Sequence, residues 1–265
     1  MSTSAKLNIV IGGGTGLIGK ALTSKLLSRN ASVRIITRNP RHNKDMSWET
    51  VESCGLPEDT DVIINLAGRY VGEVSPGLLI PSVDNGFLAR LVREWETACS
   101  STRLEGVKRV LVRIGVVLSK DGGFLSRLYQ THRLGLGGPI GSGQQWISWI
   151  HIDDLVNLFC FLIMSPAGKH LSDAVNATAP YPVRQGAFSH ALSESLSAPF
   201  AGGHIFTPAF MVRAIMGRER APLLLEGQRV LPAKAQEAGF KFNYPTLELA
   251  LENIYGKRPR PVSTY

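Results

Sequence analysis

Three glycines near the amino-terminal end have a spacing that suits the binding of a pyrophosphate. Gly13, Gly16 and Gly19 follow an apolar run over residues 7–11 and lead into apolar residues at helical spacing. A pyrophosphate approaches backbone N–H groups closely only where no Cβ intervenes, and a helix amino terminus adds unpaired donors and partial positive charge. The spacing is Gly-x-x-Gly-x-x-Gly. A strand before it and a helix after it favour a dinucleotide site over a turn that binds nothing.

The residues after the second predicted strand bear on the choice of cofactor. In a dinucleotide-binding fold, an acidic residue at this point binds the ribose 2′-hydroxyl and selects NAD. This sequence instead has Thr37 and Arg38, with Arg41 close behind. A hydroxyl and a planar cation suit a 2′-phosphate, so the pattern favours NADP(H). The alternative is that Arg38 is a solvated loop cation.

Buried strands and helices alternate along the first part of the chain. We expect strands over residues 7–11, 32–37, 61–66 and 107–118, and helices over residues 16–28, 47–53, 87–99, 124–134 and 153–165. This alternation predicts an α/β fold with a Rossmann-like, doubly wound parallel sheet. Leu66, Ala67 and Gly68 end the third strand, where small residues leave room for the cofactor. Asp153 or Asp154 is expected to cap its helix.

The pattern changes after residue 171 to short helical segments punctuated by proline. We expect helices over residues 183–196, 208–216 and 246–254, with a short strand over residues 174–177. The predicted domains are therefore a cofactor-binding domain over residues 1–171 and a small, mostly helical C-terminal lobe over residues 172–265. The lobe would close over the ligand.

Composition is that of an ordinary globular protein. The chain has 265 residues, 44% of them hydrophobic, and a formal net charge of +8. No apolar run approaches the roughly 18 to 20 residues of a membrane span, so we expect a cytoplasmic protein without a membrane partner, or one in the mitochondrial or another organelle matrix. Scattered positive charges favour a basic surface suited to phosphate ligands over nucleic-acid binding. We expect no metal site, a small-molecule substrate and, as one option, a homodimer.

Several motifs together resemble a known family. They are residues 12–19 (Gly-Gly-Gly-Thr-Gly-Leu-Ile-Gly), 65–68 (Asn-Leu-Ala-Gly), 87–96, 113–118 (Arg-Ile-Gly-Val-Val-Leu), 133–143, 149–155 and 223–232. The sequence resembles atypical extended short-chain dehydrogenases/reductases, in particular the epimerase family with a C-terminal domain of unknown function. The resemblance implies an NADP(H)-binding Rossmann domain and an oxidoreductase or sugar-nucleotide-epimerase-like activity of unassigned substrate. It adds Thr15, Leu17, Ile18 and Val117 to the cofactor-binding residues.

Two departures from the family pattern affect the catalytic half. The chain is shorter after Gly68, which would remove one central strand and leave Tyr70 as a remnant of its end. No tyrosine precedes a lysine by four positions, so the usual Tyr-x-x-x-Lys acid/base pair is missing. The remaining catalytic candidates are Tyr70 and His151, and His151 could equally tie loops together by hydrogen bonds. An oxidoreductase is thus predicted, with an inactive, cofactor-binding or regulatory module (a shortened isoform) as the alternative.

Overall fold

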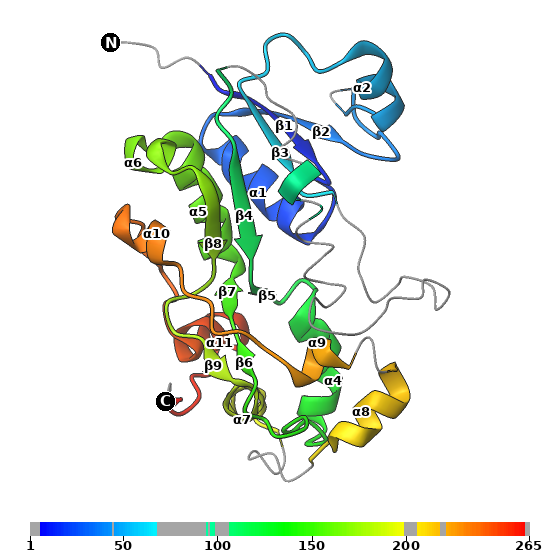
Figure 1. The fold of residues 1–265 in the computed structure, drawn as a ribbon, viewed down its shortest axis with the longest axis vertical. Helices are drawn as coiled ribbons and strands as arrows, with labels where there is room; N and C mark the ends of the chain where they lie inside the picture. Colours follow the sequence, from blue (N-terminus) through cyan, green and yellow to red (C-terminus); the bar gives the residue numbers. More distant parts are fainter. Residues whose placement is uncertain are drawn as a thin grey trace.

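The structure, a computed structural model, describes residues 6–43, 45–67, 94, 96–98, 106–198, 206–217 and 221–262. Parallel strands with the helices α1 (Leu17–Ser28) and α5 (Ile152–Met164) form one end of the molecule, and the helices α4 (Phe124–Arg133), α7 (Gln185–Ser195) and α8 (Ala209–Met216) lie at the other (Figure 1). Gly68, Tyr70 and most of the helix expected over residues 87–99 lie outside the described residues.

Three parallel strands carry the glycine turn. The central strand is β1 (Asn8–Gly12), with β2 (Ser32–Ile36) on one side and β3 (Val62–Asn65) on the other. Ile9, Val10 and Ile11 are at most 1% exposed, as their apolar run predicts. The expected strands and the helix between them are confirmed to within one or two residues. The short helix α2 (Trp48–Cys54) follows β2 and is also as predicted.

The strand expected over residues 107–118 is two strands with different partners. β4 (Val110–Ile114) pairs with β8 (Asp173–Ala177), and β5 (Val116–Leu118) pairs with β7 (Trp149–His151), both in parallel. The partner changes at Gly115. Its N–H donates to the Ala177 carbonyl at 3.0 Å, whereas the next N–H donates to the Ser148 carbonyl at 2.8 Å. A Cβ on Gly115 would lie 2.6 Å from that Ser148 oxygen, so glycine is needed at the switch.

The described strands do not form one continuous sheet. Within the described residues, β3 pairs with β1 alone and β4 pairs with β8 alone. Ile63 on β3 is 53% exposed, although a strand in the middle of a doubly wound sheet is normally buried on both faces. This break lies where the sequence predicts that a central strand is missing.

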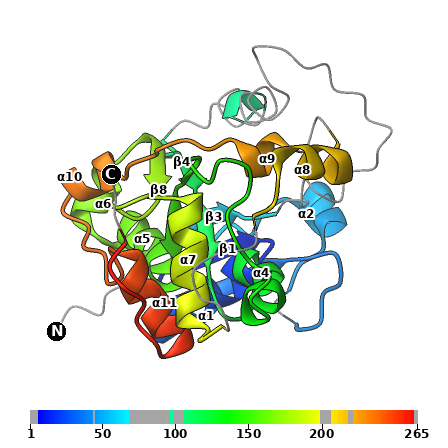
Figure 2. The same cartoon turned by 90° about the horizontal axis from the view of Figure 1, so that it is seen from below.

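The rest of the chain forms α4 and the C-terminal part. Its elements are α4 (Phe124–Arg133), β6 (Trp146–Ile147), α6 (Pro166–His170), β9 (Val183–Arg184), α7 (Gln185–Ser195), α8 (Ala209–Met216), α9 (Pro222–Leu225), α10 (Ala233–Glu237) and α11 (Leu247–Tyr255). Figure 2 shows α7 and α11 side by side, with α4 nearby. β8 follows the predicted boundary at residue 171 but pairs with β4 of the preceding region. None of the described helices is long and apolar enough to cross a membrane.

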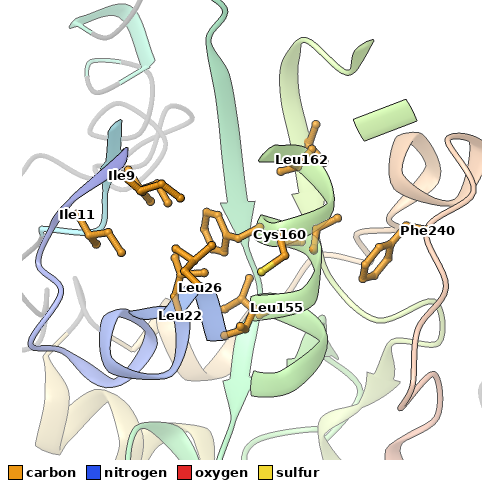
Figure 3. Close-up of a cluster of buried hydrophobic side chains, with 14 of the residues drawn as sticks. Ile9, Ile11, Leu22, Leu26, Leu155, Cys160, Leu162 and Phe240 are labelled. Atoms are coloured by element: carbon orange, nitrogen blue, oxygen red, sulfur yellow. The ribbon is translucent and has the colours of Figure 1, made fainter. Parts of the chain in front are cut away.

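Two apolar clusters hold these parts together. The first lies between the strands, α1 and α5, and includes Leu22, Leu26 and Leu155, all fully buried (Figure 3). Fully burying one such leucine stabilises the fold by about 1.5–3 kcal/mol. The second cluster joins β5 and β7 to α7 and α11 through Trp149 and Phe188, among others. The first cluster fixes α1 against the sheet and thereby sets the position of the glycine turn.

The amino terminus of α5 differs from the prediction. The helix begins at Ile152, and the Nδ1 atom of His151 accepts the N–H of Asp153 at 3.1 Å. The predicted capping by Asp153 or Asp154 is therefore wrong. Asp154 is fully buried instead, and its carboxylate accepts the backbone N–H groups of Asn243 (2.8 Å) and Tyr244 (2.9 Å). Asp154 in the first turn of α5 therefore binds backbone about 90 residues away instead of capping the helix.

Candidate cofactor site

Gly13 brings three strand ends together. It has φ +77°, and a Cβ there would lie 2.7 Å from the Leu66 carbonyl carbon and 2.8 Å from the Ala67 nitrogen. The Gly13 N–H donates to the Ile36 carbonyl at 3.2 Å. The turn after β1 therefore touches both the end of β2 and the end of β3. Leu66 and Ala67 lie beside it, as their expected role in cofactor binding requires.

The three glycines of the motif have different neighbours. A Cβ on Gly19 would lie 2.4 Å from the Gly13 oxygen, so this residue allows α1 to pack tightly on the turn. A Cβ on Gly16 would meet only that same oxygen, at 3.4 Å, and Gly16 is exposed. Packing therefore explains Gly13 and Gly19 but leaves Gly16 unexplained. At Gly16 the missing side chain uncovers backbone on the outside of the turn.

The exposed amino terminus of α1 can hold an anion. Gly16 is its N-cap, no side chain caps the helix, and the first turn has no acidic residue. Thr15 is exposed next to it, and the first turn consists of Leu17, Ile18 and Gly19. A helix start of this kind presents unpaired N–H donors and about half a positive charge. The predicted residues of the glycine turn thus surround one exposed helix start, and their binding of a pyrophosphate stays a prediction.

The end of β2 lies beside this turn and carries the predicted ribose-binding residues. The Thr37 N–H donates to the Met46 carbonyl at 2.9 Å, which fixes the backbone just before Arg38. The Arg38 side chain is exposed and takes part in no ion pair with a described residue. The carboxylate of Asp45 turns back on its own loop and accepts the N–H groups of Arg41 and His42, both at 3.0 Å. Arg38 is therefore available for a phosphate.

Val117 and Leu17 in the first turn of α1 both lie beside Gly123, and the predicted role of Val117 on the nicotinamide side stays a prediction. Gly123 belongs to the turn after β5. A Cβ on Gly123 would lie 3.2 Å from the Leu17 side chain and 3.9 Å from the Val117 carbonyl oxygen. Gly123 thus lies between Leu17 of α1 and Val117 of β5.

His151 occupies a structural position. Its side chain is 2% exposed, and its ring centroid lies 4.0 Å from that of Tyr244. Burial lowers the pKa of the imidazole, and the nearby Asp153 carboxylate partly offsets this. Because Nδ1 accepts the Asp153 N–H, the neutral ring carries its proton on Nε2. The observed role is that of a helix cap, and the catalytic role stays a prediction.

One residue near the turn escaped the sequence analysis. A Cβ on Gly12 would lie 3.2 Å from the Trp48 ring and 3.2 Å from the Asn65 side-chain oxygen. Trp48 therefore covers the end of β1 from α2. The sequence signal that could have indicated Trp48 is Ser47, because its hydroxyl caps α2 by accepting the Thr50 N–H at 3.0 Å. This cap makes Trp48 the first residue of the helix.

Comparisons with known proteins agree with this geometry. Residues 207–254 match the family model of a domain of unknown function, DUF1731. Epimerase family protein SDR39U1 of Bos taurus is 32% identical, over 94% of this chain and 99% of the relative. The chloroplastic SDR39U1 homolog of Arabidopsis thaliana is 32% identical, over 94% of this chain and 87% of the relative.

Solved structures show the same relationship. The crystal structure of human epimerase family protein SDR39U1 (isoform2) with NADPH has a TM-score of 0.82 and 29% identity, over 95% of this chain and 100% of that chain. The predicted cofactor is thus the one found in this related structure. UDP-N-acetylglucosamine 4-epimerase of Bacillus cereus, at 14% identity, has a TM-score of 0.65, covers 94% of this chain and 98% of its own, and supports the fold alone.

The alignment also shows that this chain is shorter than its relatives. The Bos taurus alignment spans 303 residues, but 94% of 265 is about 249, so about 54 aligned positions have no counterpart here. This length difference fits the shortening predicted from the motifs. Identity, coverage and fold lead to one conclusion: the chain belongs to the epimerase family of atypical extended short-chain dehydrogenases/reductases that carry a C-terminal DUF1731 domain.

Proposed function

We propose that this chain binds NADP(H) in the crevice bordered by the glycine turn, the end of β2 and the end of β3. The observation that carries the proposal is Gly16, whose missing side chain is not explained by packing and uncovers the start of α1. A pyrophosphate fits there because it accepts hydrogen bonds from the first-turn N–H groups. The human relative crystallised with NADPH supports the same cofactor.

Arg38 supports NADP(H) over NAD(H). Its guanidinium is exposed just after β2, beside the turn that Gly13 ties to Ile36. A guanidinium binds a phosphate by two parallel hydrogen bonds, whereas the ribose 2′-hydroxyl of NAD gives it little to hold. When bound, NADP(H) supplies the hydride chemistry. The residues of this chain hold its phosphates and, through Leu17 and Val117, border its nicotinamide side.

Membership of the family supports a proposal for the reaction class. We propose an oxidoreductase or epimerase-like protein acting on a small-molecule substrate that is not yet assigned. We place the protein in the cytoplasm, with an organelle matrix as the alternative compartment because the plant relative is named chloroplastic, and a homodimer is one option for its assembly. Light scattering of the purified protein tests the dimer, and imaging of a fluorescent fusion tests the compartment.

Fluorescence titration with NADPH and with NADH tests the cofactor. We expect saturable binding of NADPH that is tighter than that of NADH. Replacing Arg38→Ala should weaken NADPH binding about tenfold and leave NADH binding almost unchanged, because it removes one charge-assisted phosphate contact. Arg213→Ala is the matched control, since Arg213 is an exposed arginine on α8. Absence of saturable NADPH binding would refute the proposal.

A second candidate function is an NADP(H)-binding module without turnover. Two observations favour it: the sequence has no Tyr-x-x-x-Lys, and within the described residues β3 and β4 each lack a partner on one side. Thermal melting and a panel of carbonyl substrates distinguish the candidates. A melting temperature raised by NADPH together with turnover supports the enzyme, and the same rise with no turnover supports the module.

A further inference from the structure

A basic cavity lies at the opposite end of α1 from the glycine turn. It has a volume of about 570 Å³ and is bordered by α1, by α5 and by the segment that follows α10. Lys25 on its wall is nine residues beyond Gly16, which is about 14 Å along a helix that rises 1.5 Å per residue. The cavity is therefore separate from the proposed cofactor crevice. Its volume falls in the range of small-molecule sites.

Three cations line this cavity without a carboxylate. Lys25 and Arg29 come from the end of α1, and Lys241 comes from the segment after α10. None of them forms an ion pair with a described residue. The negative end of the α1 dipole accounts for the first two but not for Lys241, which arrives from more than 200 residues away in the sequence. Three neighbouring positive charges favour an anion between them.

The nearby acidic groups do not neutralise the cavity. Asp154 holds the backbone N–H groups of Asn243 and Tyr244 from the inside of the fold and is fully buried. Burial raises the pKa of its carboxyl, and the two backbone N–H groups that it accepts oppose this shift. Asp153 is exposed at the start of α5 and does not line the cavity.

The inner wall of the cavity is apolar. Phe161 and Phe240 contact each other edge to face, with ring centroids 5.5 Å apart, and Met164 and the buried Cys160 complete this wall. Figure 3 shows Cys160 on α5, with Phe240 on the side away from Leu22 and Leu26. A ligand that matches both walls has a charged head and an apolar body.

We propose that this cavity binds an organic anion, with a carboxylate or phosphate head held by Lys25, Arg29 and Lys241 and an apolar body resting on Phe161 and Phe240. This site is independent of the proposed NADP(H) site. A carboxylate head and a phosphate head are recognised in the same way, since ammonium and guanidinium groups donate charge-assisted hydrogen bonds to either. The titrations described next distinguish a carboxylate ligand from a phosphate ligand.

Calorimetric titration with hexanoate, hexyl phosphate, inorganic phosphate and hexanol tests the ligand class. Each titration is run with and without saturating NADPH, so that binding in the cofactor crevice is recognised by its loss. We expect at least one hexyl anion to bind saturably in both conditions. Inorganic phosphate and hexanol should bind at least tenfold more weakly, because each uses one wall only. Absence of saturable binding of both hexyl anions would overturn the proposal.

Charge variants test the location of the site. Arg29→Gln and Lys241→Gln should each lower the affinity about threefold to tenfold, a range set by partial screening of exposed charges. Ser165→Asp places a carboxylate on the cavity wall at the N-cap of α6, where aspartate is favoured, and should weaken binding at least as much. Lys257→Gln is the control for net charge and should bind like the unmodified protein.

Thermal melting of each variant confirms that it is folded. Arg29 and Lys241 are exposed, so their replacement should leave the melting temperature almost unchanged. Hexyl-anion binding that is unaffected by Arg29→Gln, Lys241→Gln and Ser165→Asp would place the ligand elsewhere and refute the assignment.

Discussion

Gly16→Ala should mainly weaken NADPH binding, whereas Gly13→Ala should mainly destabilise the fold. At Gly16 the φ of −75° suits any residue, and the new Cβ would lie 3.4 Å from the Gly13 oxygen. The fold should therefore lose only about 0.5–1 kcal/mol, the difference between glycine and alanine at an N-cap. The methyl group would nevertheless stand between the backbone and a pyrophosphate. Losing one charge-assisted hydrogen bond of about 1.5–3 kcal/mol weakens NADPH binding roughly tenfold to a hundredfold.

At Gly13 the same change damages the fold itself. Alanine at φ +77° costs about 1–2 kcal/mol, and the contact of 2.7 Å with the Leu66 backbone adds about 1–3 kcal/mol of overpacking. The sum of about 2–5 kcal/mol lowers the melting temperature by roughly 4–20 °C at about 2–4 °C per kcal/mol. Gly55→Ala is the matched control, because Gly55 has the same φ of +77° with no atom within 4 Å.

Differential scanning fluorimetry and NADPH titration on the three variants give the answer. Gly55→Ala reports on a positive-φ glycine that no atom crowds, so a clearly larger loss in Gly13→Ala would indicate the contact with the end of β3. NADPH affinity equal to that of the unmodified protein in Gly16→Ala would show that no phosphate lies at the start of α1. Equal melting of Gly13→Ala and Gly55→Ala would show that the chain after β3 does not pass against the turn.

Three further changes test the rest of the structure. Burial lowers the pKa of His132, so the unfolded chain binds the proton more readily than the folded chain. The free energy of unfolding should therefore fall as the pH drops below about 6.5, the pKa in the unfolded chain, towards the lower pKa of the folded chain. A series of melting temperatures from pH 8 to 5 should show a shallower fall in His132→Gln. Leu22 is a fully buried member of the first cluster, and Leu22→Ala should lower the free energy of unfolding in urea by about 2–5 kcal/mol. Leu27 is 54% exposed, and Leu27→Ala should lower it by less than about 0.5 kcal/mol. Ser47→Ala removes the cap of α2 and should cost about 1 kcal/mol in the same assay, and no loss would mean that the hydroxyl bond to the Thr50 N–H contributes nothing.

Local patterns predicted the cofactor half of the fold well. β1, the glycine turn and α1 follow from a change of apolar period within a few residues, and such local signals survive folding. The cap of α5 was predicted wrongly, because N-cap statistics favour aspartate whereas the structure uses His151. Asp154, the other candidate, instead accepts the N–H groups of Asn243 and Tyr244 from about 90 residues away. Sequence periodicity carries no information on such a contact.

The pairing of the later strands was equally hidden from the sequence. The apolar run over residues 107–118 predicts a single strand, and most of these residues do lie in strands, β4 and β5. The exchange of partners at Gly115 depends on where Ala177 and Ser148 arrive, which only the tertiary fold decides. Trp48 beside Gly12 is a similar case, because α2 meets β1 through packing and not through a local motif. The expectations for Gly68 and Tyr70 fall outside the described residues and stay predictions.

Among the described residues, the proposed phosphate-binding residues and the break between β3 and β4 lie in different places. The phosphate-binding residues stand on β1, β2 and the start of α1, which pair and pack with one another and with α5. Their strand pairing is formed by β1, β2 and β3 alone, and α5 packs against them in the first cluster. A shortened chain can therefore keep a complete nucleotide crevice while the residues that face a substrate change. If the second candidate function holds, the chain should bind NADPH with little or no turnover, and restoring about 54 residues from a relative after Gly68 should raise turnover far more than NADPH affinity.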